Sequence, residues 1–395
     1  MFSSRVPAST EPNRLSRALS HFRQQGARSL VDLTISNPTR AGFDYPGDLL
    51  SSLGHARGLD YAPMPLGLLG ARRAVADDFA RRGLTVAPED IALTSSTSEA
   101  YSLAFKILGD PGDEVLIPRP SYPLFEHLTQ LDALVAVPYD LEYHGTWSID
   151  MAGLERSLTP RTRALLVVNP NNPTGSFVTA DEMDHLARLC GERDVAIISD
   201  DVFADYELTA GAAARAGRLI GRHDVVGFTL GGLSKSIGLP QAKLAWMALS
   251  GPPDRVEVAR ARLELAADTY LSVSTPVQAA ARDLLTAGAS VRRQIQNRVT
   301  INHQHVRAQT AGTPSCRVLQ ADGGWYVVLQ VPSLVSEEEL VLALLAEDAV
   351  LVHPGYFFDF AAESFLIVSL LTPEHDFCEG VSRLLQRFAD RPAAS

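Results

Sequence analysis

The sequence predicts an α/β fold in which a mainly parallel sheet lies between two layers of helices. Short, continuously apolar segments alternate along the chain with segments whose apolar residues have helical spacing. Buried parallel strands have this continuously apolar character because both of their faces are covered. Polar and small residues follow several of the apolar segments directly. Since ligands of α/β sheets bind at the carboxyl ends of the strands, we expect a ligand-binding site at these positions.

The elements of the large sheet are expected in the following order. A helix is expected over 66–83, because its apolar residues have helical spacing and Gly83 ends it. A short strand at 90–96 leads into a helix that starts with Ser98 and Glu99. The other expected elements are strands at 113–118, 164–169, 195–200 and 224–231, with a helix at 181–193.

The pattern changes near residue 291, where a long helical stretch is followed by a mixture of short strands and helices. A chain of 395 residues exceeds the size at which a single core keeps growing. We therefore expect a large domain at 46–285 and a smaller α+β domain formed by 1–45 and 286–395. The N-terminal part contains its own expected helix, Arg14–Gln25.

Composition excludes several classes of function. The net charge of −11 and the absence of a basic run argue against binding of nucleic acid. No run of ~18 apolar residues is present, so we expect no membrane span. Three widely spaced cysteines, Cys190, Cys316 and Cys378, form neither a disulfide framework nor a CxxC pair. We expect a cytoplasmic protein without a metal site.

Lysine is rare in this chain. Of 35 basic residues only Lys106, Lys235 and Lys243 are lysines, so chemistry that needs a primary amine has few candidates. Lys235 follows the apolar strand 224–231 and is flanked by small residues. An amine in a crowded, partly desolvated site has a lowered pKa and can attack an aldehyde. Lys106 lies inside an expected helix, where we interpret it as a solvated surface residue.

Three other strand ends carry polar groups. TSSTSEA places hydroxyl residues at a helix N-terminus, where they form either an anion site for phosphate or an ordinary N-cap. NPNNPTG is a tight turn after a strand, and Asp200 ends a strand of apolar character. A carboxylate at that depth needs a positive or proton-donating partner. With Lys235, these groups are the set that pyridoxal phosphate requires: a phosphate cradle, a carboxylate for the ring nitrogen and an amine.

At these residues the chain resembles the fold-type-I pyridoxal-phosphate enzymes, specifically the class I/II aminotransferases. The resemblance covers nearly the whole chain, with 28 residues from Asn172 to Asp200 and 35 from Asp200 to Lys235. The segments that carry it are YAPMPLGLLGARRAVA (61–76), TSSTSEA (94–100), GDEVLIPRPSYP (112–123), NPNNPTG (169–175), DDVFADY (200–206), LSKSIGLPQAK (233–243), GGWY (323–326) and HPGYFF (353–358).

The resemblance implies a mainly parallel sheet of the seven-stranded type, pyridoxal 5′-phosphate as cofactor and a role for each matching residue. Lys235 would form the internal aldimine and move the proton between Cα and C4′. Asp200 would pair with the pyridinium nitrogen, Asn172 would bind the phenolic oxygen, and Tyr122 would stack on the ring. The phosphate would be held by Ser96, Thr97, Ser98 and Lys243, and by Tyr61 of the other subunit. A homodimer with shared sites follows from that last contact.

The chain departs from the family pattern at four places. Gly232 replaces a serine that usually supports the phosphate. Lys243 replaces an arginine that binds the phosphate through two parallel hydrogen bonds. The ammonium group of a lysine is a point charge and does not reproduce this bidentate geometry. Phe203 replaces a tyrosine that donates to the phenolic oxygen. Ile367, in FLIVSLL, stands where the family has the arginine that binds the substrate carboxylate, and no arginine occurs between His353 and Ser382.

Either another group binds the substrate carboxylate, or the amino donor lacks a conventional α-carboxylate contact. The expected candidates are Arg40 and its neighbour Asn37 in SNPTRAGF, or Arg119 in PRPSY. We interpret the chain as an aminotransferase that moves an amino group between an amino acid and a 2-oxo acid by a ping-pong mechanism. The alternative is a lyase or decarboxylase of the same fold. A cofactor-sensing transcription regulator would need a basic DNA-binding domain, which we do not expect here.

Overall fold

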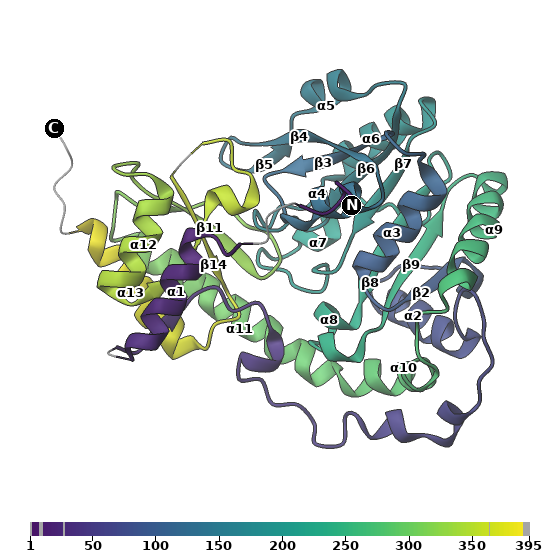
Figure 1. Ribbon diagram of the computed structural model, residues 1–395, viewed down its shortest axis with the longest axis horizontal. Coiled ribbons are helices and arrows are strands. Elements are labelled where there is room, and N and C mark those ends of the chain that lie inside the picture. Colours follow the sequence, from purple (N-terminus) through teal and green to yellow (C-terminus); the bar gives the residue numbers. More distant parts are fainter. Residues whose placement is uncertain (1, 8–10, 27, 363, 390–395) are drawn as a thin grey trace.

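The computed structural model describes residues 2–7, 11–26, 28–362 and 364–389. The chain forms two lobes, each built around its own sheet, and one long helix, α11 (Ala289–Thr310), runs from the larger lobe into the smaller one (Figure 1). The predicted fold class is confirmed: a large, mainly parallel sheet between helices and a smaller antiparallel sheet. Within the described residues the large sheet has eight strands instead of the expected seven.

The sheet of the large lobe is parallel from β8 to β4, and β9 lies antiparallel between β2 and β8. All five strands predicted for this sheet are present, and β4, β5 and β9 are additional. Most of β4 is only partly buried, so it lacks the continuous apolar character that marks the central strands. In sheet order the strands are β2 (Ile91–Thr94), β9 (Ala245–Ser250), β8 (Gly227–Gly232), β7 (Ala196–Asp200), β6 (Thr162–Val168), β3 (Glu114–Arg119), β4 (Val135–Tyr143) and β5 (Trp147–Ile149).

Helices cover both faces of this sheet (Figure 1). Along β6, Leu166 packs in the apolar core that α3 and α9 contribute to, while Leu165 packs in the core on the side of α6. Because successive strand residues point to opposite faces, both must be apolar. The large-lobe helices are α2 (Leu69–Arg81), α3 (Thr97–Leu108), α4 (Leu124–Leu131), α5 (Met151–Ser157), α6 (Ala180–Glu192), α7 (Ala212–Arg215), α8 (Leu233–Ser236), α9 (Pro253–Tyr270) and α10 (Thr275–Ala287).

The small lobe holds an antiparallel sheet in the order β10 (Arg317–Val318), β11 (Tyr326–Gln330), β14 (Phe365–Ser369) and β13 (His353–Pro354). Its other elements are α1 (Arg14–Gln25), β1 (Val31–Asp32), α12 (Glu337–Asp348), β12 (Val350–Leu351) and α13 (Glu374–Ala389).

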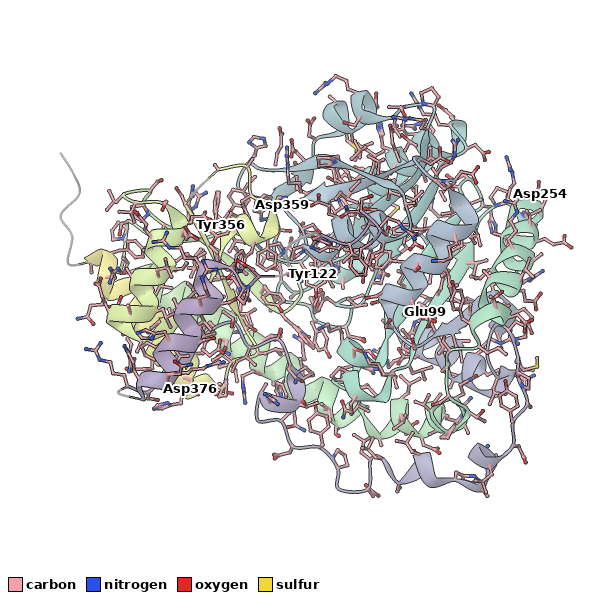
Figure 2. All side chains as sticks on the ribbon, viewed as in Figure 1. Glu99, Tyr122, Asp254, Tyr356, Asp359 and Asp376 are labelled. Carbon is pink, nitrogen blue, oxygen red and sulfur yellow. The ribbon has the colours of Figure 1, made fainter. Side chains whose placement is uncertain are left out.

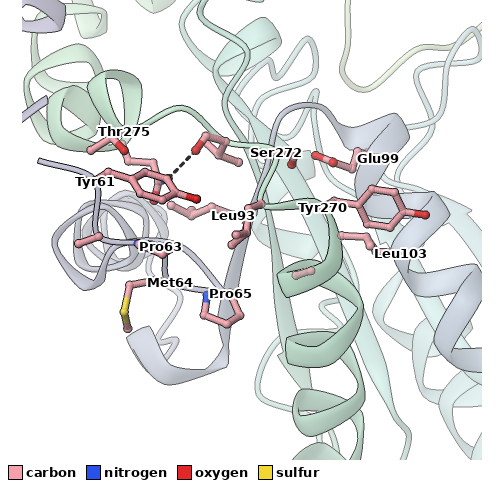
Figure 3. Close-up of a pocket in the computed structure, with 16 residues that line it drawn as sticks. Tyr61, Pro63, Met64, Pro65, Leu93, Glu99, Leu103, Tyr270, Ser272 and Thr275 are labelled. Carbon is pink, nitrogen blue, oxygen red and sulfur yellow. Dashed lines mark hydrogen bonds between the residues drawn. The ribbon is translucent and has the colours of Figure 1, made fainter. Parts of the chain in front are cut away.

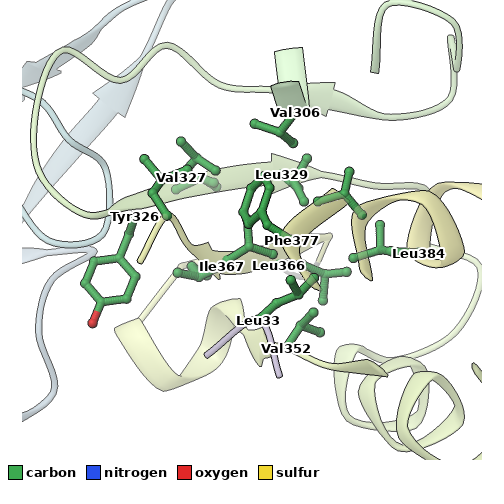
Figure 4. Close-up of a cluster of buried hydrophobic side chains, with 14 of the residues drawn as sticks. Leu33, Val306, Tyr326, Val327, Leu329, Val352, Leu366, Ile367, Phe377 and Leu384 are labelled. Atoms are coloured by element: carbon green, nitrogen blue, oxygen red, sulfur yellow. The ribbon is translucent and has the colours of Figure 1, made fainter. Parts of the chain in front are cut away.

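The N-terminal part of the chain packs in this lobe, because β1 pairs in parallel with β12. Leu33 lies among Ile367, Phe377 and Leu384 in the apolar core (Figure 4). The predicted domain boundaries at 45/46 and 285/286 stay a prediction.

The small lobe rests on the turn that follows β6. The backbone N–H groups of Asp322 and Gly323 both donate to the carbonyl of Gly175, at 2.9 Å. Gly175 has a φ of +70°, and a Cβ there would lie 2.6 Å from the carbonyl oxygen of Gly323. The last residue of NPNNPTG is therefore a glycine for two reasons, its backbone conformation and the close approach of the other lobe.

Two kinds of feature are absent from the residues that the structure describes. None of their helices is both long and apolar enough to cross a membrane. Their histidine, cysteine and acidic side chains nowhere gather in a group of three that could hold a metal ion.

Candidate active site

The predicted site residues lie where β6, β7 and β8 end at one edge of the sheet. Asp200 is the last residue of β7, and the N–H of Asn169, just past the end of β6, donates to its carbonyl at 2.8 Å. Strand β8 ends at Gly232 and continues directly into the short helix α8, which carries Lys235. Parallel strands end at a common edge, and this geometry gathers residues that are 28 to 35 positions apart in the sequence.

The amine of Lys235 lies among aromatic rings. Its Nζ is 5.1 Å from the ring centroid of Trp325 and 5.7 Å from that of Phe203. Burial lowers the pKa of Lys235, and the negative charge of Asp200 offsets part of this effect. A lysine with a lowered pKa is neutral more of the time, and only the neutral amine is a nucleophile or a base.

Two side chains, Tyr206 and Arg292, donate hydrogen bonds to the backbone of α8, the short helix that carries Lys235. No sequence pattern indicates these contacts. The hydroxyl of Tyr206 donates to the carbonyl of Lys235 at 2.5 Å and to that of Ser236 at 3.2 Å. Nε of Arg292, on α11, donates to the same Ser236 carbonyl at 2.8 Å. Tyr206 lies in the DDVFADY segment, but nothing in that segment indicates its partner.

Asp200 is buried with both carboxylate oxygens engaged. Oδ2 accepts a hydrogen bond from the hydroxyl of Tyr101 at 2.7 Å, and Oδ1 accepts one from the N–H of Val202 at 3.1 Å. Burial raises the pKa of Asp200 to about 6, although both hydrogen bonds act in the opposite direction. A positively charged group beside this carboxylate would lower its pKa again, so the site favours a cationic partner.

Two of the three asparagines of the turn NPNNPTG, Asn171 and Asn172, differ in their surroundings. The side-chain amide of Asn171 donates to the carbonyl of Pro120 at 3.1 Å and to the hydroxyl of Thr174 at 2.9 Å, so it holds the turn together. Asn172 is also buried, but its side-chain oxygen has no partner among the residues that the structure describes. Buried polar atoms are rarely left unpaired, so Asn172 is the amide available to a ligand.

The start of α3 combines both interpretations of TSSTSEA. The hydroxyl of Ser96 caps the helix by accepting a hydrogen bond from the N–H of Glu99 at 3.2 Å. The Glu99 carboxylate in turn accepts from the N–H of Ser95 at 2.6 Å. The hydroxyls of Thr97 and Ser98 make no hydrogen bond to another residue in the described part of the chain. These two hydroxyls and the first N–H groups of α3 remain open to an anion.

The other residues expected at the cofactor lie near the surface of the single chain. Tyr122 is 42% exposed and meets the ring of Phe125 edge-on, with 6.2 Å between centroids. Figure 2 shows Tyr122 at the junction of the two lobes, where the N–H of Ser121 donates to the carbonyl of Phe358 at 3.0 Å. Lys243 is exposed, and Tyr61 is 76% exposed.

The candidates for the substrate carboxylate differ in their partners. Arg119 is already paired with both oxygens of Asp140, at 2.7 and 3.1 Å. Asn37 begins a short turn of helix that ends at Arg40, and both are exposed. Arg40 makes no ion pair within the described residues. Ile367 has no exposed surface and packs inside the small-lobe core, so it offers the site no polar group (Figure 4).

Comparison with known proteins identifies the family. Residues 54–383 match the family model described as aminotransferase class I and II. The glutamate-pyruvate aminotransferase AlaA of Escherichia coli (strain K12) is 27% identical, over 88% of this chain and 87% of its own. The alanine aminotransferase of Mycobacterium bovis is 28% identical, over 90% and 84%.

Two solved structures are similar along almost their whole length. The alanine aminotransferase of Pyrococcus furiosus superposes with a TM-score of 0.87 at 24% identity, covering 99% of this chain and 100% of that one. A single mutant of Thermus thermophilus aspartate aminotransferase gives 0.83 at 25% identity, covering 98% and 99%. The chain belongs to the family of class I and II aminotransferases.

Proposed function

We propose that this aminotransferase uses pyridoxal 5′-phosphate to move an amino group between a small amino acid, such as alanine, and the 2-oxo acid of glutamate. The observation that carries the proposal is the desolvated amine of Lys235 near the buried carboxylate of Asp200. The substrate pair is suggested by the relatives named glutamate-pyruvate and alanine aminotransferases.

The residues present fit this cofactor. When bound, pyridoxal phosphate supplies an aldehyde that reacts with amines and a ring that stabilises negative charge at the substrate Cα. Lys235 supplies an amine with a lowered pKa. Asp200 has a raised pKa and makes no ion pair with any residue that the structure describes, as a group that awaits a protonated ring nitrogen should. The unpaired side-chain oxygen of Asn172 marks an amide that is free to meet a polar group of the ring.

Each residue then has a defined task. Neutral Lys235 accepts the proton from the substrate Cα on Nζ and later returns it, which is general acid–base catalysis. The rings of Trp325 and Phe203 cover this amine and keep water from it. Ionised Asp200 would hold the ring nitrogen in its protonated form by charge attraction. Thr97 and Ser98 would hold the phosphate, and the point charge of Lys243 would add to the binding.

A half-reaction tests the proposed function. Purified protein loaded with pyridoxal phosphate is mixed with alanine, glutamate or other amino acids in the absence of an acceptor. We expect one equivalent of the 2-oxo acid per site, because the amino group stays on the enzyme until an acceptor arrives. Ammonia or carbon dioxide released over many turnovers would instead identify a lyase or decarboxylase.

Arg40 is proposed to bind the substrate carboxylate, because Arg119 is occupied by Asp140. A hydrogen bond to a charged group contributes about 1.5–3 kcal/mol, so Arg40→Ala should raise KM for the amino acid about 10- to 100-fold. Arg119→Ala is the matched control and should leave KM within about 2-fold, because the pair with Asp140 is half exposed. Steady-state kinetics that show an unchanged KM for Arg40→Ala would exclude this assignment.

A homodimer is the assembly that we propose. Tyr61 and Met64 line a pocket together with Tyr270 and Thr275 (Figure 3). Apolar side chains nearby in the sequence are strongly exposed in the single chain, Leu59 at 87% and Leu265 at 74%. Tyr61, Met64 and Tyr270 are themselves exposed large side chains of this pocket, and a cluster of this kind is typical of subunit interfaces. Light scattering should therefore give the mass of two chains, and the mass of one chain would contradict the assembly.

A further inference from the structure

The contact between Tyr101 and Asp200 joins two elements that are far apart in the sequence. The two residues are separated by 99 positions, and the Tyr101 hydroxyl lies 2.7 Å from Oδ2 of Asp200. Tyr101 is 2% exposed and Asp200 is 7% exposed, so water cannot replace either partner freely. A buried, charge-assisted hydrogen bond is stronger than one between neutral groups and has a defined direction.

We propose that Tyr101 is a positioning residue that holds the Asp200 carboxylate in the orientation in which it receives the protonated ring nitrogen of the cofactor. This inference rests on the proposed function. The hydroxyl of Tyr101 and the N–H of Val202 bind different oxygens of the same carboxylate. Two donors on two oxygens fix the plane of the carboxylate as well as its position.

The ring of Tyr101 is itself held in place by aromatic contacts. It meets the ring of Phe125 edge-on, with 5.5 Å between centroids, and lies 6.0 Å from that of Phe105. Phe125 in turn meets Tyr122, the residue proposed to cover the cofactor ring, at 6.2 Å. Edge-to-face pairs of this kind have preferred geometry and are stabilising. The contacts therefore connect the carboxylate partner to the residue over the ring face.

Helix α3 links the two ends of the proposed cofactor site. Thr97, whose hydroxyl is open to the phosphate, is four residues before Tyr101 on the same helix. Residues four apart lie on one face of a helix, about one turn from each other. One rigid element thus sets the distance between the phosphate site and the carboxylate that meets the ring nitrogen.

Besides Tyr101, several other charged or titratable groups lie around Asp200 and affect its pKa. Asp201 raises the pKa of Asp200, whereas Lys235 and the hydrogen bonds from Tyr101 and Val202 lower it. Tyr122 also interacts with the carboxylate charge. Removing the Tyr101 hydroxyl takes away one of the lowering groups, so the pKa of Asp200 should rise further above about 6. At neutral pH less of the carboxyl group would then be ionised and able to pair with the ring.

Tyr101→Phe tests the proposal, with Tyr139→Phe as matched control. Tyr139 is also a buried tyrosine of the large lobe, but its hydroxyl donates to the carbonyl of Leu166, at 2.8 Å. Each substitution removes a single oxygen atom and keeps the ring. We expect the dissociation constant of pyridoxal phosphate to rise about 10- to 100-fold in Tyr101→Phe, the loss of one hydrogen bond to a charged group. It should stay within about 2-fold in Tyr139→Phe.

A cofactor analogue with carbon in place of the ring nitrogen distinguishes a role of Tyr101 in positioning Asp200 from a general loss of structure in the variant. This analogue has no proton for Asp200 to hold, so Tyr101→Phe should bind it as well as the unchanged protein does. Equal weakening of both cofactors, or an unchanged affinity for pyridoxal phosphate, would overturn the role of Tyr101. If the unchanged protein does not bind pyridoxal phosphate at all, the proposed function fails as well.

Discussion

Replacing Lys235 with alanine should lower the rate of amino transfer about 10⁴-fold, the upper range for loss of a positioned acid–base group. The substitution removes the amine that we propose to react with the cofactor aldehyde and to move the Cα proton. No other lysine is expected to take over this role, because the other two lysines, Lys106 and Lys243, are both exposed. The same variant should also lose the covalent attachment of the cofactor. To measure this, the protein is treated with borohydride, which reduces the bond to the cofactor, and gel filtration under denaturing conditions then shows whether the cofactor stays on the chain.

Lys106→Ala is the matched control for this prediction. Lys106 pairs with Asp132 and hydrogen-bonds to Ser102 at 2.6 Å on the surface of α3. A partly exposed ion pair of this kind contributes about 0–1 kcal/mol, so the rate should be unchanged. Full activity of Lys235→Ala, or an equal loss in both variants, would show that the amine of Lys235 is not the reacting group.

Replacing Arg292 with leucine should lower the free energy of unfolding by about 3–5 kcal/mol, the usual loss when one partner of a buried ion pair is removed. Arg292 is 3.0 Å from Asp78 and 3.4 Å from Asp205, and all three side chains are at most 10% exposed. Arg81 binds the same two carboxylates and remains to compensate part of the charge. The variant also leaves the carbonyl of Ser236 without the guanidinium that donates to it.

Denaturant unfolding of Arg292→Leu measures this loss, and Arg282→Leu is the control. Arg282 pairs with Asp77, the neighbour of Asp78, at 2.8 Å, but both side chains are about 60% exposed. We expect Arg282→Leu to change stability by less than about 1 kcal/mol. If the two variants are equally stable, the buried network does not carry the stability assigned to it.

The pH dependence of the same experiment has a defined sign. Burial raises the pKa of Asp78. The hydrogen bond with Arg81 and the charges of Arg292 and Arg81 lower this pKa by more than burial raises it, so the pKa lies below its ordinary value of 3.8. A carboxyl group with a depressed folded-state pKa stabilises the protein above the unfolded-state pKa and loses this contribution as the pH falls through the folded-state pKa. The difference between the unchanged protein and Arg292→Leu should therefore be largest near neutral pH and shrink below about pH 4.

Local sequence was sufficient for much of the fold. Leu165 and Leu166 lie in cores on opposite faces of the sheet, so an apolar run was the correct indicator of the central strands. The same criterion failed for β4, which has side chains exposed along its length because it lies near the edge of the sheet. Strand β9, by contrast, is short and buried, and it directly follows the motif that carries Lys235. Its apolar residues were assigned to no element.

The sequence by itself determined which residues we propose for the chemistry, because an amine, a carboxylate or an amide is a property of the residue type. Lys235, Asp200 and Asn172 also follow strands, and parallel strands end at one edge. Only the tertiary structure decided what supports them. Tyr101 reaches Asp200 across 99 positions, and Arg292 reaches the carbonyl of Ser236 across 56. Such partners depend on how helices pack against strand ends. This packing results from many contacts between residues distant in sequence, so neither segment alone contains a signal for it.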